Sequence, residues 1–300
     1  MSPYALAAWL IFSTVGLAPL STPQTALVLD HVTVVDVVEG SLVPDMRIVI
    51  RADTIRAVGR SDEIAIPPGA RVVDGEGLYT LPGLWDMHVH LHAWEETGPA
   101  LLVANGVTGV REMGGVFVDL DRLRRRIASD EIPGPRMVIA GEMLDGPTPG
   151  DWPFRITVTT PEEGRLAVRD QLERGVDFIK TKEFLDEETF LAIAEAAREM
   201  GLPLTGHVPQ GMSAVDVARR GQRSVEHLAG TPSCAAPEGS SPASTETDPC
   251  PNPAFDAAVQ AFLAQETWHT PTLTVARAFI DLADSLPSSG PRVRFRTDAV

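Results

Sequence analysis

Lysine, cysteine and positive charge are all scarce in this sequence. Only two of the 25 basic residues are lysines, Lys180 and Lys182, and both lie in the segment FIKTK. The two cysteines are too few for a disulfide-built scaffold or for a zinc finger with thiolate ligands. The 41 acidic residues give a net charge of −16, which argues against nucleic acid as a partner because its phosphates would be repelled.

Charged residues are absent before Asp30, and residues 5–18 form the apolar run ALAAWLIFSTVGLA. The run is shorter than a membrane-spanning helix needs, but its length is typical of the core of a signal peptide. We therefore expect residues 1–26 to be a signal peptide or an N-terminal anchor, although no Lys or Arg precedes the run. The protein is then expected to be exported, either to a periplasm or out of the cell.

Both cysteines, Cys234 and Cys250, lie in an insertion at residues 231–253 that is rich in Pro and Ser. In an oxidising compartment, a disulfide between them would restrict the conformations of the loop. Two free thiols in a surface insertion are the alternative.

The hydrophobic pattern changes along the chain. Residues 27–82 contain short alternating stretches broken by Gly, Pro and Asp, which predicts a small antiparallel β-unit. From residue 83 to residue 300, short apolar strand candidates alternate with amphipathic helix patterns. The strand candidates are GLWDMHVH, GVTGVREM, RMVIAGEM, VDFIKTK, LPLTGHV, RSVEHL and WHTPTLTV.

Repeated alternation of strand and helix predicts an α/β fold with a parallel sheet, either an open doubly wound sheet or a barrel. A TIM-type (β/α)8 barrel normally takes about 250 residues and eight strands. Seven strand candidates are found here, so the expected barrel is incomplete.

Several histidines fall at the ends of these strand candidates. His88 and His90 are two positions apart on one strand, so they share a face, while His207 and His227 each end a later strand. Because the carboxyl ends of the strands in a parallel barrel meet at one rim, these side chains are expected to converge with Lys180. Four imidazoles at one place predict a divalent metal site, with zinc as the first expected ion.

Other candidates have simpler interpretations. His31 and His269 are expected to be ordinary core or surface residues, and His92 is expected to lie in the loop at the rim. Residues in or after the barrel loops could line a pocket, although loop packing is the simpler expectation; they are Trp94, Trp152 and Arg155.

The segments PGLWDMHVHLH, GVTGVREMGG, FIK, GHV and EHL together resemble the amidohydrolase superfamily. The resemblance is closest to the imidazolonepropionase-like branch, which includes metal-dependent prolidases, and it runs from about Ala26 to the end of the chain. It implies a (β/α)8 barrel flanked by a β-sandwich, with residues 27–82 as the first half of that sandwich. It also implies two divalent metal ions.

The resemblance assigns the metal ligands by position. His88 and His90 would bind the first ion, and histidines on later strands, His207 and His227, would bind the second. A carboxylated lysine would bridge both ions, and the apolar residues before it select Lys180 over Lys182. An arginine could not form such a carbamate, which suits a lysine at this position in a chain that otherwise uses arginine.

One family element is not found. The family's aspartate at the end of strand eight, in a Gly-Thr-Asp context, binds metal and shuttles protons. Asp298 lies in RFRTDAV, where Arg296 replaces the expected glycine, so we expect Asp298 in a loop or helix start and leave the catalytic residue unidentified. The expectation is therefore a barrel truncated before strand eight, with a full-length but degenerate chain as the alternative.

The predicted function is hydrolysis of amide bonds in small peptides or N-acyl amino acids by water activated on the metal ions. Lactone or phosphoester hydrolysis on the same two-metal centre is the alternative within enzymes. A catalytically impaired fragment, or a binding protein on a decayed hydrolase scaffold, is the alternative outside them. The expected partner is a small molecule or short peptide, and assembly into a homo-oligomer is left open.

Overall fold

The computed structural model describes residues 25–94, 97–148, 153–228, 230–232, 252–275 and 277–278. The chain divides into two compact units, Met1–Pro82 and Gly83–Val300, and each is treated by itself. None of the helices within the described ranges combines the length and the apolar character that crossing a membrane requires. Several predictions fall wholly or largely outside these ranges, namely the signal peptide or anchor, the cysteine-containing insertion with Cys234 and Cys250, Trp152 and Asp298.

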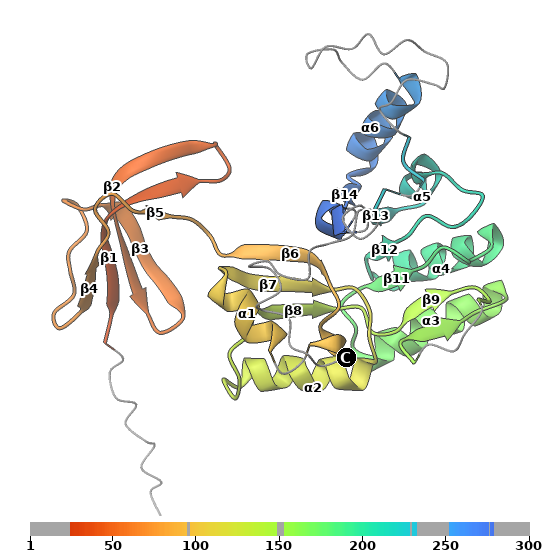
Figure 1. Ribbon diagram of the computed structural model, residues 1–300, viewed down its shortest axis with the longest axis horizontal. Coiled ribbons are helices and arrows are strands. Elements are labelled where there is room, and N and C mark those ends of the chain that lie inside the picture. The colour runs from red at the N-terminus through yellow and green to blue at the C-terminus, as the bar shows by residue number, and fades with distance from the viewer. Residues whose placement is uncertain are drawn as a thin grey trace, which may run out of the picture. The chain divides into compact units, whose positions relative to one another are not determined.

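The first unit is a five-stranded sheet with the order β3-β2-β1-β4, in which β5 also pairs with β1 (Figure 1). The β1–β2 and β2–β3 pairs are antiparallel, whereas β4 and β5 run parallel to β1. The expected antiparallel unit is therefore a mixed sheet, and the sandwich remains a prediction. The strands are β1 (Leu27–Asp36), β2 (Ser41–Arg51), β3 (Thr54–Arg60), β4 (Arg71–Asp74) and β5 (Tyr79–Thr80).

A buried ion pair ties β1 to β2. Asp30 is 6% exposed, and its carboxylate accepts hydrogen bonds from Nε of Arg47 at 2.7 Å and from Nη2 at 2.9 Å. These bonds from Arg47 outweigh the cost of burial and hold the pKa of the Asp30 carboxyl below its ordinary value.

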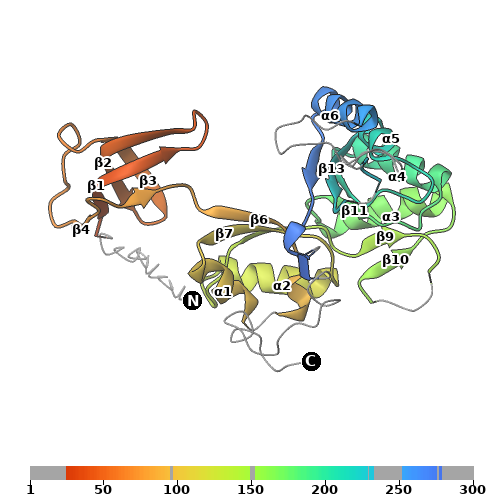
Figure 2. The ribbon, with the colours of Figure 1, turned by 45° about the horizontal axis from the view of Figure 1, so that its top comes forward.

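The second unit is built on parallel strands (Figures 1 and 2). One sheet has the order β6-β7-β8, and the other has the order β10-β9-β11-β12-β13-β14. The strands are β6 (Leu84–Val89), β7 (Val107–Glu112), β8 (Arg136–Ile139), β9 (Met143–Asp145), β10 (Arg155–Thr157), β11 (Ile179–Thr181), β12 (Leu204–Gly206), β13 (Gln222–Glu226) and β14 (Trp268–Thr270).

The two sheets follow one another across a break in a single strand candidate. The segment RMVIAGEM contains β8 and ends at Met143, the first residue of β9, with residues 140–142 between the two strands. Backbone bonds bridge the break, since Ala140 N donates to Glu112 O at 3.2 Å and Asp177 N donates to Ile139 O at 2.8 Å. All the predicted strand segments are therefore strands, in the predicted parallel arrangement.

The predicted barrel is not closed within the described residues. Closure would need a strand that pairs with both β6 and β14, and the described residues supply none. Large apolar side chains on these two strands are consequently exposed, with Trp85 at 45%, Met87 at 43% and Trp268 at 74%. The α/β class is thus confirmed, and the architecture seen is an open row of parallel strands.

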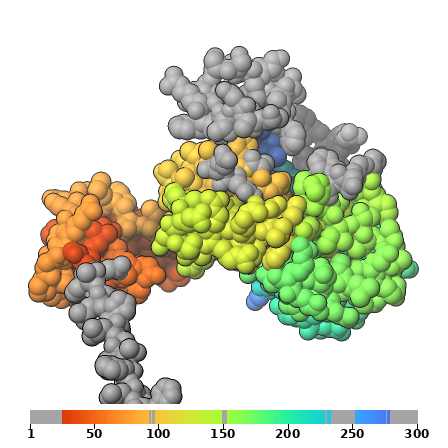
Figure 3. Space-filling model, turned by 90° about the horizontal axis from the view of Figure 1, so that it is seen from below, coloured from red at the N-terminus to blue at the C-terminus, as the bar shows by residue number. Residues whose placement is uncertain are grey.

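Helices line the second unit, and α2 to α5 each bury three or more residues. Helices α3 to α6 lie along the strand row in Figure 2, and Figure 3 shows the surface formed by the yellow-to-green helical segments. Helices α3 and α4 have N-terminal caps, because the side chains of Thr160 and Asp186 accept hydrogen bonds from the backbone N–H groups of Glu163 and Thr189. The helices are η1 (Leu91–Ala93), α1 (Gly98–Ala104), α2 (Phe117–Ala128), α3 (Pro161–Arg174), α4 (Glu187–Glu199), α5 (Ala214–Arg219) and α6 (Pro253–Gln265).

The core of the second unit lies between the strands and these helices. Phe190, Ile193 and Ala197, three or four residues apart on α4, are fully buried against apolar residues of neighbouring elements. This packing fixes the strands whose carboxyl ends carry the candidate site.

Candidate metal centre

The predicted ligands all lie at the carboxyl ends of parallel strands. His88 is the second-last residue of β6 and His90 directly follows that strand, while Lys180 is in β11. His207 comes directly after β12, and His227 comes directly after β13. The topology therefore brings residues that are far apart in sequence to one edge of the strand row.

The four histidines form a continuous chain of ring contacts. The ring centroids of His88 and His90 are 5.4 Å apart, and those of His88 and His227 are 4.7 Å apart. His207 continues the chain, with its ring centroid 4.7 Å from that of His227. The structure thus brings together every histidine that the sequence selected.

Lys180 is buried among these histidines without a partner. The side chain is 0% exposed, and its Nζ has no hydrogen-bond partner among the described residues. Burial disfavours the ammonium form and lowers the pKa of Lys180 to about 7. Such an isolated amine is costly, so an unpartnered lysine at this place needs a chemical explanation.

Lys182 lies on the same face of the chain but has partners. Its Nζ donates to His207 Nε2 at 3.3 Å and lies 2.9 Å from a carboxylate oxygen of Glu183. The two lysines therefore differ in their contacts. Lys182 contacts Glu183 and a site histidine, whereas the Nζ of Lys180 has no hydrogen-bond partner among the described residues.

Glu226 orients His88. The Nδ1 atom of His88 is 2.7 Å from Oε2 of Glu226. The bond to His88 and the charges of Lys180 and Arg111 together outweigh burial and keep the pKa of the Glu226 carboxyl below its ordinary value. An ionised carboxylate can only accept, so the His88 proton lies on Nδ1 and the lone pair lies on Nε2.

A buried arginine holds Glu226 from the other side. Arg111 donates from Nη2 to Oε1 of Glu226 at 2.7 Å, and Ser224 donates from its hydroxyl to the same oxygen at 2.6 Å. Arg111 also donates to Thr270 Oγ1 at 3.2 Å on β14. The Glu226 carboxylate is thus fully hydrogen-bonded, as a buried charge requires.

Burial favours the neutral form of three of the four imidazoles, and the neutral form is the one that binds metal. Burial lowers the pKa of His88 to about 4 and lowers the pKa of His207 and His227 below the ordinary value, with the charge of Lys180 adding to the effect. Neutral imidazoles beside a buried, unpartnered amine fit the donor set of a divalent metal centre.

Gly206 allows His207 to reach this position. Its φ of +143° lies where residues with a Cβ are strained, and a Cβ there would meet the carbonyl oxygen of Thr181 at 2.3 Å. The glycine in the GHV segment is therefore required by the close approach of β12 to β11.

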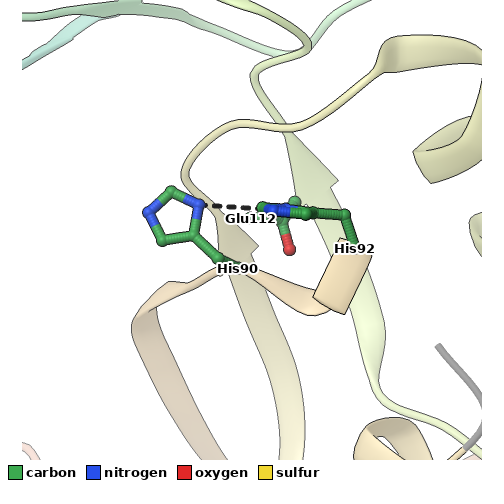
Figure 4. A group of neighbouring side chains, drawn as sticks. All are labelled: His90, His92 and Glu112. Carbon is green, nitrogen blue, oxygen red and sulfur yellow. Dashed lines mark ion pairs between the residues drawn. The ribbon is translucent and has the colours of Figure 1, made fainter. Parts of the chain in front are cut away.

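A second group of potential ligands adjoins the first. His90, His92 and Glu112 each offer a ligand atom, and these atoms lie within 4.8 Å of one another (Figure 4). His90 Nδ1 donates to Gly114 O at 2.8 Å and is 3.6 Å from Oε1 of Glu112. His92 was expected only at the rim, and here its ring lies beside His90, at 5.9 Å between centroids.

Sequence reasoning missed the charged residues that support the histidines. Arg111, Glu112 and Glu226 are 8%, 0% and 0% exposed, and all three lie within the strand segments VREM and VEHL. Charged residues inside a buried strand are rare unless they are paired, so their presence in these apolar segments could have indicated a paired, buried group. Glu226 and His227 both face the site although they are adjacent, because His227 has a φ of +62° and leaves the strand pleat.

The remaining candidates also have defined places. Trp94 lines a hollow of about 480 Å³ together with His90 and Leu91, whereas Arg155 pairs with Asp145 at 3.1 Å. His31 is on the first unit and pairs with Asp45, and the Nε2 of His269 contacts the backbone carbonyl of His227. His269 therefore supports the loop that carries a site residue.

Parallel strands with helices between them, and histidines gathered at the strand ends, are features that the second unit shares with barrels of the TIM type. The model of the Amidohydrolase family matches residues 79–239, more than half of the 300 residues. The chain belongs to this family, and the predicted membership of the amidohydrolase superfamily is confirmed.

Solved structures agree with this assignment. A Bifidobacterium longum protein assigned as a prolidase is 29% identical, with a TM-score of 0.60, over 69% of this chain and 55% of that protein. A Xaa-Pro dipeptidase with bound methionine in its active site is 20% identical, with a TM-score of 0.63, over 90% of this chain and 72% of that one. These neighbours are consistent with the prolidase-like branch.

Among curated proteins, adenine deaminase from Rubrobacter xylanophilus is 30% identical over 95 residues. The match covers 32% of this chain and 15% of that enzyme. The chain thus spans only a small part of this curated relative and about half of the Bifidobacterium longum protein.

Proposed function

We propose that the protein is a metal-dependent hydrolase that cleaves amide bonds of small peptides or N-acyl amino acids. The observation that carries the proposal is the chain of ring contacts from His90 through His88 and His227 to His207, with the unpartnered Lys180 buried beside it. Members of the family generally use divalent metal ions, and the donor set here fits them.

The ligands divide between two ions, with zinc as the expected metal. His88 and His90 would hold one ion, and His207 and His227 the other. Two such ions supply Lewis acidity, which activates a water molecule and polarises the carbonyl oxygen of the amide. The protein residues orient the donors: Glu226 keeps the His88 proton on Nδ1, so that the Nε2 lone pair faces the metal side.

Lys180 is the proposed bridging ligand in its carboxylated form. The neutral amine forms an N–C bond with carbon dioxide and releases one proton, which gives a carbamate anion with two oxygens. Burial lowers the pKa of Lys180 to about 7, so the amine needed for this reaction is abundant near neutral pH. The carbamate would also relieve the isolated cation that the site otherwise contains.

Substrate selection is proposed to involve the hollow beside His90. Trp94 and Leu91 give it apolar walls next to a candidate ligand, which suits the side chain of a small peptide. The group that carries the proton to the leaving nitrogen is not assigned to any residue.

Metal analysis and a substrate panel test the proposal. The purified chain should contain about two equivalents of zinc. His88→Ala should lose the metal of the two-metal centre and the activity, whereas the matched variant His31→Ala, on the first unit, should keep both. The panel contains Xaa-Pro and other dipeptides, N-acyl amino acids, lactones, phosphotriesters and adenine. Absence of bound metal in the wild-type chain would reject the proposal.

The same panel separates the alternatives. Turnover of lactones or phosphotriesters, with no turnover of peptides, would assign the centre to those bonds. Adenine is included because of the match to adenine deaminase, an enzyme whose name also implies cleavage of a C–N bond. Metal binding without any turnover would favour the impaired fragment or binding protein.

Further proposals concern the whole protein. We propose that it is exported, with residues 1–26 as signal peptide or anchor, that residues 27–82 and 83–300 are its two domains, and that Cys234 and Cys250 form a disulfide. N-terminal sequencing of the mature protein and thiol titration test these points. The exposed apolar side chains of Trp85 and Trp268 make a homo-oligomer worth testing by light scattering.

A further inference from the structure

His90, His92 and Glu112 form a three-ligand group that adjoins the proposed two-metal centre and shares His90 with it. Figure 4 shows the three side chains converging, with one ring nitrogen of His90 turned toward Glu112 and the other turned away. The ligand atoms of all three residues lie within 4.8 Å of one another. Two imidazoles and one carboxylate are a donor set used by zinc and by other first-row divalent metals.

Glu112 is fixed in place for this role. Its side chain is 0% exposed, and Oε2 accepts the backbone N–H of Leu91 at 2.5 Å, while Oε1 accepts that of Gly114 at 3.3 Å. A carboxylate has about four lone-pair positions, so two backbone bonds leave room for a metal ion. These bonds also stop the carboxylate from turning away, as supporting bonds to metal ligands commonly do.

His92 supplies an independent observation. Its Nδ1 atom is buried, yet it has no hydrogen-bond partner among the residues that the structure describes. The ring is held against Phe154, with centroids 5.0 Å apart, so its orientation is set by packing. A buried ring nitrogen without a partner is costly, and coordination of an ion is one way to satisfy it.

We propose that His90, His92 and Glu112 bind a single divalent transition-metal ion, of which Zn²⁺ is the representative, at a site separate from the His88–His227 side of the centre. The proposal shares His90 with the proposed hydrolytic site but does not require hydrolysis. The His90 side chain is 38% exposed, which gives an ion a route of entry from solvent.

His90 makes the two sites mutually exclusive. A neutral imidazole has one lone pair, on Nδ1 or on Nε2 but not on both. In the structure Nδ1 donates to Gly114 O, so the lone pair is on Nε2, on the side away from Glu112. An ion bound with Glu112 and His92 would use an Nδ1 lone pair and require the proton on Nε2, so the Nε2 lone pair would no longer be available to the two-metal centre. Excess metal is therefore an inhibitor by this route.

Equilibrium dialysis of the metal-depleted full chain against Zn²⁺ tests the proposal. His92→Asn and Glu112→Gln should each weaken one class of bound Zn²⁺ at least about tenfold, because each removes one of three ligands. The matched control, His31→Asn, removes an imidazole from the first unit and should bind as the wild type does. His88→Ala should keep this class of bound Zn²⁺, because His88 is not a ligand of it.

The outcomes are distinct. Equal Zn²⁺ binding by the wild-type chain and His92→Asn would overturn the proposal, and so would loss of this class of binding in His88→Ala. His92 is partly exposed, so its variant gives an answer even if Glu112→Gln does not fold. A chain that hydrolyses none of the panel substrates would reject the proposed function while leaving the Zn²⁺ result at His92 unaffected.

Discussion

Lys180 is central to the proposed chemistry of this site, because it is the proposed ligand of both metal ions. Its amine is buried and has no partner among the described residues, so the metal-free protein carries an unsatisfied group worth about 1–3 kcal/mol of destabilisation. Natural proteins keep such a cost mainly where the group has a function.

Replacing Lys180 by methionine should therefore have opposite effects on stability and on activity. We expect Lys180→Met, measured without metal, to raise the free energy of unfolding by about 1–3 kcal/mol, since it fills the same volume without a buried amine. With metal, the variant should lose more than about 100-fold in hydrolysis, because a ligand of both ions is gone. Urea unfolding and hydrolysis rates measure the two effects.

Two further lysine variants refine this prediction. Lys180→Ala should regain part of its activity when propionate is added, because a small carboxylate can occupy the vacated space and supply two oxygens. Lys182→Met removes the paired lysine instead and should keep metal stoichiometry. If Lys182→Met lost both metal ions and Lys180→Met kept them, the bridging lysine would be Lys182, and the assignment to Lys180 would be wrong.

Glu226 should matter through its effect on His88. Glu226→Gln keeps the shape but places an amide opposite His88 Nδ1, so the preference for the tautomer with a free Nε2 is lost. We expect metal affinity to fall about 10–100-fold, as for other partners of metal-ligating histidines. Competition with a chromogenic chelator measures the metal affinity of the wild type and of the variant. Glu266→Gln, which changes an exposed acid paired with Arg223, is the control.

At the scale of single elements, the presence of a strand was easier to predict than the residues at which it begins and ends. The alternation of apolar stretches identified every strand of the parallel row except β10, whose three residues are too short for a pattern. Helices α1 and α5 were missed for the same reason, since seven and six residues make less than two turns. The break between β8 and β9 could not be predicted from a local sequence pattern, because it depends on pairing with strands distant in sequence: β8 pairs with β7, and β9 pairs with β11.

The ion pair between β1 and β2 should make the first unit sensitive to acid. The pKa of Asp30 is lowered in the folded state, so the pair contributes stability above the ordinary value of 3.8 and loses it as the pH falls through the folded value. The difference in unfolding free energy between wild type and Asp30→Asn should therefore be full at pH 5 and decline as the pH falls below 3.8 through the lowered folded value. His31 stays protonated over this range because its pKa is raised.

Circular dichroism during urea unfolding at several pH values measures this difference. Asp53→Asn, which changes an exposed acid in the turn between β2 and β3, should show no comparable loss between pH 5 and pH 2. A difference for Asp30→Asn that grows as the solution becomes more acidic would contradict the sign of the prediction.

For the whole molecule, the candidate site connects parts of the second unit that are otherwise separate sheets. His88 belongs to the β6-β7-β8 sheet, while His207 and His227 follow strands of the other sheet. An ion held from both sides stabilises the folded chain by RT ln(1 + [L]/Kd), about 4 kcal/mol when the free metal is 1,000 times Kd.

Metal removal should therefore lower the unfolding temperature of the second unit. Dialysis against a chelator should shift its transition down by several degrees, and added Zn²⁺ should restore it. The first unit has no part in the proposed centre and serves as the internal control. An unchanged transition in calorimetry after complete removal of bound metal would contradict the proposed bridging.

At this scale, the sequence identified the histidines and their convergence but not the groups that hold them. The motif order and the parallel topology were enough to place His88, His207 and His227 at one edge. The pairing of Arg111 with Glu226 joins β7 to β13, and only the assembled strand row defines it. The role of His92 depends on Glu112 and Phe154, which no spacing rule connects to it.

The bond between His88 and Glu226 joins residues that are 138 positions apart in the chain. Ribosomes add about 5–20 residues per second, so roughly 7–28 s separate the synthesis of His88 from that of its partner. Between the synthesis of Glu112 and that of His207, the nascent chain contains His88, His90, His92 and Glu112 but neither of the later site histidines, His207 and His227. If the proposed site exists, the order of translation would complete the His90–His92–Glu112 ligand set first, and the two-metal centre could compete for His90 only after β13 and His227 have been made.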